Sequence, residues 1–387
     1  MSEEILNNEA QKAELEKIEK IKSSLARIEK KESKFLFCVP EAPHPTAAVY
    51  EIYFHATVVK KMGYITVMLT EKEDYVVPKW IEGELTDIKH IPMNDNKLTV
   101  GPEDVMVIPD VFSNVMEQTK NLPCVRVGLL QSVDYMINAL VPGTDWRALG
   151  INDIITTSET LKEFVQTFYG TKKFSIQTYN PSVPDYFKRT DAPQQPVISI
   201  VGRNPNEISK LVKLFFARYP QYAWVTFDPL LTKSKPPQPM RRKDFAERIR
   251  GNFAAVWVDR LASWGTFPLE CMKSGVLPIA LVPDITPEYL LERDDEGNVV
   301  QMKQESGVWT NNFYELPVLI GEAIVKYLDD NIGDQLYDNM EAIASKYTPE
   351  KAEAELVTAY SNLLNERKGI FEKALALPAE EKEAVQE

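Results

Sequence analysis

The sequence predicts an α/β protein of two domains, each a mostly parallel, doubly wound sheet, facing each other across a cleft. The chain has 387 residues, more than one hydrophobic core usually organises. From residue 34 onwards, short apolar runs alternate with amphipathic stretches, a pattern typical of repeated strand–helix units. The alternation stops in a proline-rich stretch at 180–196 and then starts again, which places a domain boundary there.

The first domain is predicted to span residues 34–182. An apolar helix is expected over 46–61, ending before Gly63, whose freedom at positive φ suits a helix stop. Ser158 has the residue type of an N-cap and is expected to begin another helix. Apolar runs predict strands at 35–40, 64–69, 104–109, 124–130 and 153–157.

The second domain is predicted to span 197–350, after a linker at 183–196. Helices are expected up to Tyr219 and from about Pro268, which suits the first turn of a helix. Apolar runs predict strands at 197–202, 223–227, 254–258 and 276–282.

Helical segments are predicted at both ends of the chain. Residues 1–33 are rich in Glu and Lys, and their apolar residues follow helical spacing at Ile18, Ile21, Leu25 and Ile28. This amphipathic helix is expected to dock on the body of the protein, to form a weak homodimer contact, or to be a solvated extension. A long helical segment is expected from about 334, with 351–387 as a helical tail.

Composition excludes several classes of protein. The formal net charge of −13 argues against general binding of nucleic-acid backbones, which needs a broad cationic surface. Cys38, Cys124 and Cys271 lie in apolar runs and are expected to be reduced core residues, not disulfides or metal ligands. We expect no metal and no cofactor. The start of the chain lacks a secretory pattern, and no apolar run reaches about 18 residues. These features predict a cytoplasmic protein without a transmembrane segment.

The strongest motif is WGTFPLECMKSGVLPI at 264–279, a glycine turn followed by a helix and a second glycine. It resembles the donor-site signature of the group 1, retaining glycosyltransferases, which have the two-Rossmann-domain GT-B fold. The resemblance implies that Glu270 hydrogen-bonds the ribose of a nucleotide-sugar donor. It also implies that Gly265 and Thr266 bring backbone N–H groups to the donor phosphate, as helix N-termini can.

A second match to this family is IVGR at 200–203. The resemblance implies that Gly202 lies at the donor and that Arg203, with a lysine shortly afterwards, clamps the donor diphosphate. We favour Lys210 for that lysine, although it lies two positions later than the family's spacing, and Lys213 is the alternative. The two cations would stabilise the departing nucleotide by charge alone.

The sequence departs from the family at two places. The family's first glutamate, close to the sugar, is replaced here by the pair Ala262-Ser263, and Arg260 is the nearby charge that could serve the donor site instead. The loop after the first strand lacks the family's glycines and contains His44, a candidate acceptor contact. Gln131 and Asp134 lie in a segment that resembles a cleft-lining part of some members, so they are also candidates on the acceptor side.

Positive charge concentrates in one stretch of an otherwise acidic chain. A patch of this kind suits an anionic acceptor, such as a polysaccharide, a lipid carrier or a modified base in DNA, although a solvated loop is an equal alternative. Its residues are Lys233, Lys235, Arg241, Arg242, Lys243, Arg248 and Arg250.

Taken together, the motifs predict transfer of a sugar from a nucleoside diphosphate donor to an unidentified acceptor, with retention and without metal as the resemblance implies. A sugar-nucleotide epimerase on the same scaffold is one alternative. A non-catalytic glycosyltransferase-like binding or scaffold protein is the other, because Ala262-Ser263 and the acceptor loop depart from the family.

Overall fold

A parallel sheet in the order β3-β2-β1-β4-β5-β6-β7 forms the centre of the first domain. The computed structural model describes residues 2–42, 46–81, 85, 87–138, 140–170, 173–192, 194–229, 240–329 and 334–376. The strands of this sheet are β1 (Lys34–Val39), β2 (Ile65–Thr70), β3 (Lys89–Pro92), β4 (Val105–Pro109), β5 (Val125–Leu130), β6 (Asp153–Thr156) and β7 (Ser175–Thr178). β1 pairs in parallel with both β2 and β4, so the strand order changes direction between β1 and β4.

Helices cover both faces of this sheet, and their caps agree with the sequence. Thr46 Oγ1 accepts the N–H of Val49 at the start of α2, and Ser158 Oγ accepts that of Leu161 at the start of α5. The helices of this domain are α2 (Ala47–Lys61), α3 (Ser113–Gln118), α4 (Val133–Asn138) and α5 (Glu159–Tyr169).

The second domain has its own parallel sheet, in the order β14-β11-β10-β8-β9. Its strands are β8 (Gln195–Gly202), β9 (Thr226–Pro229), β10 (Asn252–Val258), β11 (Leu277–Leu281) and β14 (Val308–Thr310), and a separate hairpin pairs β12 (Leu291–Arg293) with β13 (Val299–Met302). The strand order changes direction between β8 and β10. Its helices are α6 (Pro205–Arg218), α7 (Arg242–Arg250), α8 (Thr266–Lys273), α9 (Leu316–Leu328) and α10 (Asp334–Ala344).

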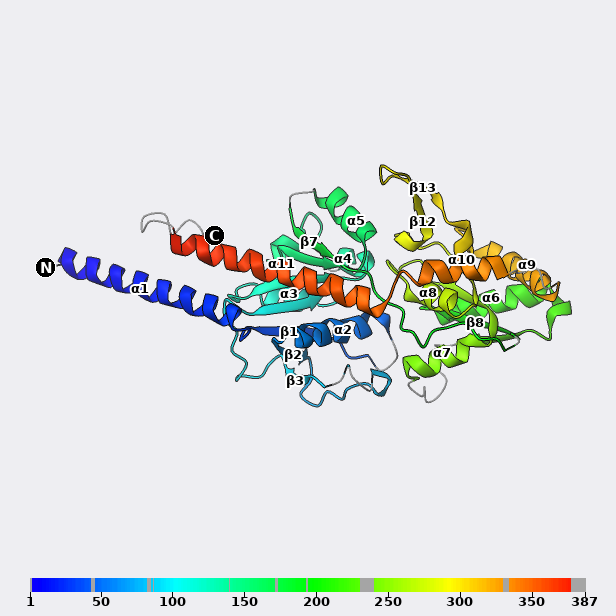
Figure 1. Cartoon of the computed structure of the whole chain (residues 1–387), viewed down its shortest axis with the longest axis horizontal. Coiled ribbons are helices and arrows are strands. Elements are labelled where there is room, and N and C mark those ends of the chain that lie inside the picture. The colour runs from blue at the N-terminus through cyan, green and yellow to red at the C-terminus, as the bar shows by residue number, and fades with distance from the viewer. Residues whose placement is uncertain are drawn as a thin grey trace.

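The last described helix, α11 (Pro349–Ala376), returns to the first domain. Figure 1 shows it starting at the domain junction, next to the end of α10, and running across the first domain toward α1. Leu356 and Tyr360 are fully buried there, and the Tyr360 ring meets the ring of Phe35 edge-on at 5.5 Å. The predicted helical segment from 334 is therefore two helices, α10 and α11, which belong to different domains.

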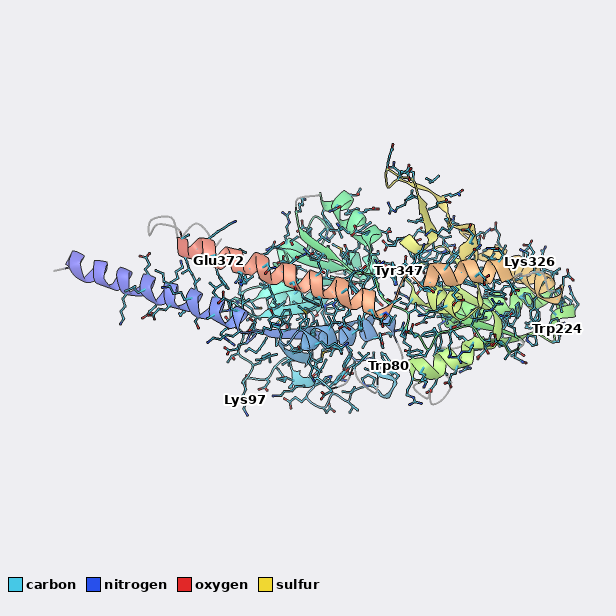
Figure 2. The ribbon with its side chains drawn as sticks, in the orientation of Figure 1. Trp80, Lys97, Trp224, Lys326, Tyr347 and Glu372 are labelled. Carbon is cyan, nitrogen blue, oxygen red and sulfur yellow. The ribbon has the colours of Figure 1, made fainter. Side chains whose placement is uncertain are left out.

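The chain crosses between the domains twice at one place. The outgoing crossing begins near Val183, whose N–H donates to the carbonyl of Tyr347 on the returning crossing at 2.9 Å. Figure 2 shows Tyr347 at the junction of the two domains. Val183 and Phe187 are buried in the core of the second domain, so this part of the predicted linker packs against that domain.

Helix α1 (Ser2–Glu29) projects from the far end of the first domain (Figure 1). Near its C-terminal end, Ile28 is buried in the first-domain core, and Ser24 Oγ donates to Glu103 Oε2 at 2.9 Å. Arg27 forms an ion pair with the same carboxylate. These contacts favour docking on the body for that end of the helix, and the homodimer contact stays a prediction.

The predicted fold class, two doubly wound α/β domains with helical additions at both ends, is confirmed. Cys38, Cys124 and Cys271 are buried and form no disulfide, as expected. Across the described ranges, no helix has both the length and the apolar character needed to cross a membrane.

Candidate functional site

The carboxyl ends of β8 and β10 flank the point where the second sheet changes direction, which is where doubly wound folds bind ligands. Arg203 follows β8 and Asp259 follows β10, and Arg203 Nε donates to Asp259 Oδ2 at 2.7 Å. The Arg203 side chain is 41% exposed. Its guanidinium carbon lies 5.8 Å from the ring centre of Tyr135 in the first domain. Arg203 therefore faces the first domain, as the predicted diphosphate clamp requires.

Gly202 and Arg260 lie at the same two strand ends. A Cβ atom on Gly202 would be 2.7 Å from the carbonyl oxygen of Val258, so the close approach of β8 and β10 requires glycine here. Arg260 Nη2 donates to the carbonyl of Asn311, just after β14, at 2.6 Å. Arg203 and Arg260 thus place two guanidinium groups along one edge of the sheet.

The predicted second cation, Lys210, lies on α6 and points to the end of β14. Its Nζ donates to the hydroxyl of Tyr314 at 2.6 Å and lies 4.5 Å from the centre of that ring. Lys213, the alternative, lines with Lys210 a pocket of about 470 Å³ on the surface of α6. Ile208 occupies the family's usual lysine position and is only 6% exposed. The role of Lys210 at the diphosphate stays a prediction, since its present partner is Tyr314.

A tight turn at Gly265 leads into α8. Gly265 has φ of +69°, and a Cβ atom there would lie 2.3 Å from the ring of Trp257. The hydroxyl of Tyr289 donates to the carbonyl of Gly265 at 2.7 Å. Thr266 is the first residue of α8, and no side chain caps the helix. The turn therefore presents the N-terminus of α8 without a side-chain cap, in keeping with the predicted phosphate contact.

Replacing Gly265 by alanine should lower the free energy of unfolding by about 2–5 kcal/mol, because a left-handed conformation and a clash with Trp257 add together. Gly143→Ala is the matched control, since Gly143 has φ of +84° and no atom within 4 Å of the built Cβ. Gly143→Ala should lower the free energy of unfolding by roughly 1–2 kcal/mol, which is the cost of the left-handed backbone conformation alone. Denaturant unfolding measures both variants, and equal losses would contradict the clash.

Glu270 lies in α8 and is 6% exposed. Its Oε1 accepts two hydrogen bonds from Arg242, one from Nε at 2.9 Å and one from Nη2 at 2.7 Å. Arg242 Nη2 also donates to the carbonyl of Ser182 at 3.2 Å. The sequence assigned Arg242 to a solvated or acceptor-binding basic patch, and that assignment is wrong: Arg242 is buried against Glu270 at the domain junction.

Residues of the first domain pack against the buried pair of Arg242 and Glu270. The guanidinium carbon of Arg242 lies 4.4 Å from the ring centre of Tyr50, and Glu51 is the next residue on α2. Glu51 is 3% exposed, and its Oε2 accepts the hydroxyl of Tyr179 at 3.3 Å. Burial raises the pKa of Glu51 to about 7. We call Tyr50, Glu51, Tyr179, Arg242 and Glu270 the interdomain cluster.

The segment after β5 joins the two domains. The N–H groups of Gln131 and Ser132 donate to Asp110 Oδ2 at 2.8 and 2.6 Å. The hydroxyl of Ser132 donates to the carbonyl of Leu261 at 3.3 Å, and Val133 N–H donates to Ser263 Oγ at 3.1 Å. Ser263, the neighbour of Ala262, which stands where the family has its first glutamate, is therefore a contact between domains.

Asp110 was not singled out in the sequence, although an acidic residue at the end of a buried strand could have indicated it. It is buried, which raises its pKa to about 7. The predicted acceptor residues lie nearby: Gln131 Nε2 donates to the carbonyl of Ala48 at 3.0 Å. Asp134 Oδ1 accepts from Asn138 at 3.1 Å. His44 lies outside the described residues, so its acceptor role stays a prediction.

Among the other described residues of the basic patch, the three arginines are paired, and no hydrogen bond or ion pair is recorded for Lys243. Arg241 and Arg248 form ion pairs with Asp244 and Asp228, and Arg250 Nη2 donates to the carbonyl of Tyr186 at 2.8 Å. Lys233 and Lys235 lie outside the described residues. These arginines already have acceptors within the protein, which weakens the argument for an anionic acceptor at this patch.

Within the ranges that the structure describes, no three His, Cys, Asp or Glu side chains gather closely enough to hold a metal ion. The described groups at the domain junction include the guanidinium groups of Arg203 and Arg242 and the carboxylates of Glu51 and Glu270. Such groups hold an anion attached to a polyol, since cations and N–H groups bind phosphate while carboxylates accept hydroxyl hydrogen bonds.

Two doubly wound sheets whose switch points meet at one junction, with the last helix returning to the first domain, define the GT-B fold. Among solved structures, sucrose-phosphate synthase from Thermosynechococcus elongatus is similar at a TM-score of 0.58 and 12% identity, over 86% of this chain and 100% of that one. The catalytic domain of starch synthase IV from Arabidopsis thaliana, bound to ADP and acarbose, is similar at a TM-score of 0.51 and 11% identity. The match covers 87% of this chain and 99% of that one.

The pneumococcal O-GlcNAc transferase GtfA, in complex with UDP and GlcNAc, matches at a TM-score of 0.49 and 12% identity over 68% of this chain. This chain covers 57% of that protein, so it spans little more than half of its length. No family model matches the sequence, and no curated protein matches it. The similarity to sucrose-phosphate synthase and starch synthase IV confirms the resemblance at the level of the fold.

Proposed function

We propose that this protein is a glycosyltransferase that transfers a sugar from a nucleoside diphosphate donor to an acceptor bound on the first domain. The observation that carries the proposal is that Arg203 after β8 lies near Tyr135 of the first domain, while Glu270 pairs with Arg242, which lies over Tyr50 of the first domain, on a GT-B fold. Starch synthase IV, similar in fold, was solved with ADP bound. A diphosphate joined to ribose suits cations and a carboxylate placed in this way.

In the proposed reaction, the donor binds with its diphosphate near Arg203 and the N-terminus of α8. Arg203 and Lys210 stabilise the negative charge that develops on the departing diphosphate, so no proton transfer to the leaving group is needed. Glu270 accepts hydrogen bonds from the ribose hydroxyls. Contact between the domains at Ser132 and Leu261 keeps water from the sugar. Retention of configuration and independence from metal belong to the same proposal.

Binding of nucleotides tests this proposal. ADP or UDP at 100 times its Kd should raise the free energy of unfolding by about 2.7 kcal/mol. The 2′,3′-dideoxy analogue of each nucleotide should bind more weakly by about 1–3 kcal/mol, because it lacks the hydroxyl groups offered to Glu270. Adenosine and pyrophosphate alone are controls for the two halves of the ligand. Absence of stabilisation by both nucleotides would overturn the proposal.

One observation favours a second function, that of a non-catalytic glycosyltransferase-like binding protein. Ala262 stands where the family has its sugar-side glutamate, and the hydroxyl of the next residue, Ser263, already accepts the N–H of Val133. A binding protein of this kind would be stabilised by nucleotides but would release no nucleoside diphosphate from any nucleotide sugar. Measuring that release for a panel of nucleotide sugars distinguishes the two functions.

A further inference from the structure

The buried pair of Arg242 and Glu270 uses only one of the two oxygens of the carboxylate. Arg242 donates to Glu270 Oε1 twice, from Nε at 2.9 Å and from Nη2 at 2.7 Å, and no described residue donates to Oε2. An ionised carboxylate oxygen can accept two hydrogen bonds, so Oε2 alone can receive both hydroxyls of a ribose. Arg242 therefore fixes the direction of the carboxylate and leaves one oxygen open.

Arg242 also supplies the counter-charge that a buried carboxylate needs. The side chains of Arg242 and Glu270 are 14% and 8% exposed. Burying a charge is costly unless it is paired, and a charged acceptor forms stronger hydrogen bonds than a neutral one. Within the described part of the chain, Arg242 is the only cation in an ion pair with Glu270. The strength of Glu270 as a ribose acceptor thus depends on this guanidinium group.

Three separate parts of the chain hold the guanidinium group in place. Glu270 binds it from α8. Its Nη2 also donates to the carbonyl of Ser182, next to the outgoing crossing between domains, at 3.2 Å. From the first domain, the ring centre of Tyr50 on α2 lies 4.4 Å from the guanidinium carbon, a distance at which a cation is attracted to an aromatic face. Arg242 therefore links the carboxylate of the second domain to the first domain.

We propose that Arg242 is a positioning residue for the donor: it holds Oε1 of Glu270 so that Oε2 receives the ribose hydroxyls, and Tyr50 holds Arg242 in that position from the first domain. The proposal rests on the proposed function, because it takes Glu270 as the ribose ligand. Recognition of the ribose then requires both domains, although the nucleotide binds to the second. A donor that binds while the domains are apart is held more weakly, which limits its hydrolysis by water.

Arg242→Lys tests the positioning role. Lysine keeps the positive charge but offers one nitrogen in place of two donors in a fixed plane, so it no longer fixes the carboxylate. We expect the Kd of ADP and of UDP to rise about 10-fold. The Kd of their 2′,3′-dideoxy analogues should stay within about 2-fold of wild type, because these analogues offer no hydroxyls to Oε2. Calorimetry measures these Kd values, and urea unfolding checks that the variant is folded.

Arg250→Lys is the matched control for Arg242→Lys. Arg250 lies on the same helix, α7, but does not belong to the interdomain cluster. Its Nη2 donates to the carbonyl of Tyr186 at 2.8 Å, much as Nη2 of Arg242 donates to that of Ser182. The Kd of each nucleotide should match wild type in this variant. A general effect of lysine on α7 would instead appear in both variants.

Tyr50→Leu and Tyr50→Phe test the part played by the first domain and leave the ion pair in place. Phenylalanine keeps an aromatic ring beside the guanidinium group, whereas leucine removes it. The ratio of the Kd of 2′,3′-dideoxy-ADP to that of ADP should fall about 3-fold in Tyr50→Leu and stay near the wild-type value in Tyr50→Phe. These two variants decide the proposal even where Arg242→Lys is too unstable to measure.

The outcomes separate the positioning role from the proposed function. Equal weakening of ADP and its dideoxy analogue in Arg242→Lys, or an unchanged ratio of their Kd values in that variant or in Tyr50→Leu, would overturn the positioning role alone. If wild type bound both nucleotides equally well, Glu270 would not be the ribose ligand, and the positioning role would fall with that assignment. Absence of any nucleotide binding would overturn the proposed function as a whole.

Discussion

Replacing Arg203 by alanine should reduce the release of nucleoside diphosphate from a nucleotide sugar by about 10²–10³-fold, because one electrostatic contact to the leaving group is removed. The fold should survive this change. The Arg203 side chain is 41% exposed, and exposed ion pairs contribute only about 0–1 kcal/mol. The measurement is the rate of release from the nucleotide sugar that stabilises the protein most.

Arg248→Ala is the matched control for Arg203→Ala. Arg248 belongs to the same domain, its side chain is 42% exposed, and it pairs with Asp228 as Arg203 pairs with Asp259. It lies on α7, away from the carboxyl ends of β8 and β10. Its rate should match wild type. If both variants lost activity equally, the loss would come from net charge or stability, and Arg203 would not be the diphosphate clamp.

Replacing Glu270 by alanine should lower the free energy of unfolding by about 3–5 kcal/mol, since it leaves the guanidinium group of Arg242 buried without its main counter-charge. The two side chains are 14% and 8% exposed, so water screens the pair little. Loss of nucleotide binding in this variant would therefore mix a folding defect with a binding defect. Urea unfolding with and without ADP separates the two effects.

The double variant Glu270→Leu with Arg242→Met tests whether the unpaired charge of Arg242 causes the loss of stability in Glu270→Ala. It replaces the ion pair by apolar side chains of similar size, and such replacements are often neutral or stabilising. We expect its stability to return close to wild type while nucleotide binding stays lost. A double variant as unstable as Glu270→Ala would show that the buried pair is not the cause of the defect.

The central strands of both sheets could be predicted from sequence because buried strands consist of continuous runs of apolar residues. The run FLFCVP predicted β1, which lies inside the sheet with every residue but Lys34 buried. The edge strands of the first sheet escaped prediction for the opposite reason. β3 (Lys89–Pro92) and β7 (Ser175–Thr178) are short, and none of their residues is fully buried, so their sequences lack an apolar run.

The candidate site was predicted in part. Motif resemblance led to Arg203, Gly265 and Glu270; the structure places Arg203 and Glu270 at the domain junction, and the roles of all three stay predictions. The resemblance could not reveal Arg242 as the partner of Glu270, because that contact joins residues 28 positions apart through the packing of α7 on α8. Asp110 was missed because its carboxylate accepts backbone N–H groups from Gln131 and Ser132, which lie 21 and 22 positions further along the chain.

The return of α11 to the first domain imposes an order on folding during synthesis. Phe35 and Phe37 are synthesised long before Tyr360, whose ring packs on both. At ribosomal rates the interval is roughly 15–60 s, long enough for the second domain to fold while the first still exposes apolar surface. A nascent chain of this design needs shielding from aggregation until its C-terminal helix is released.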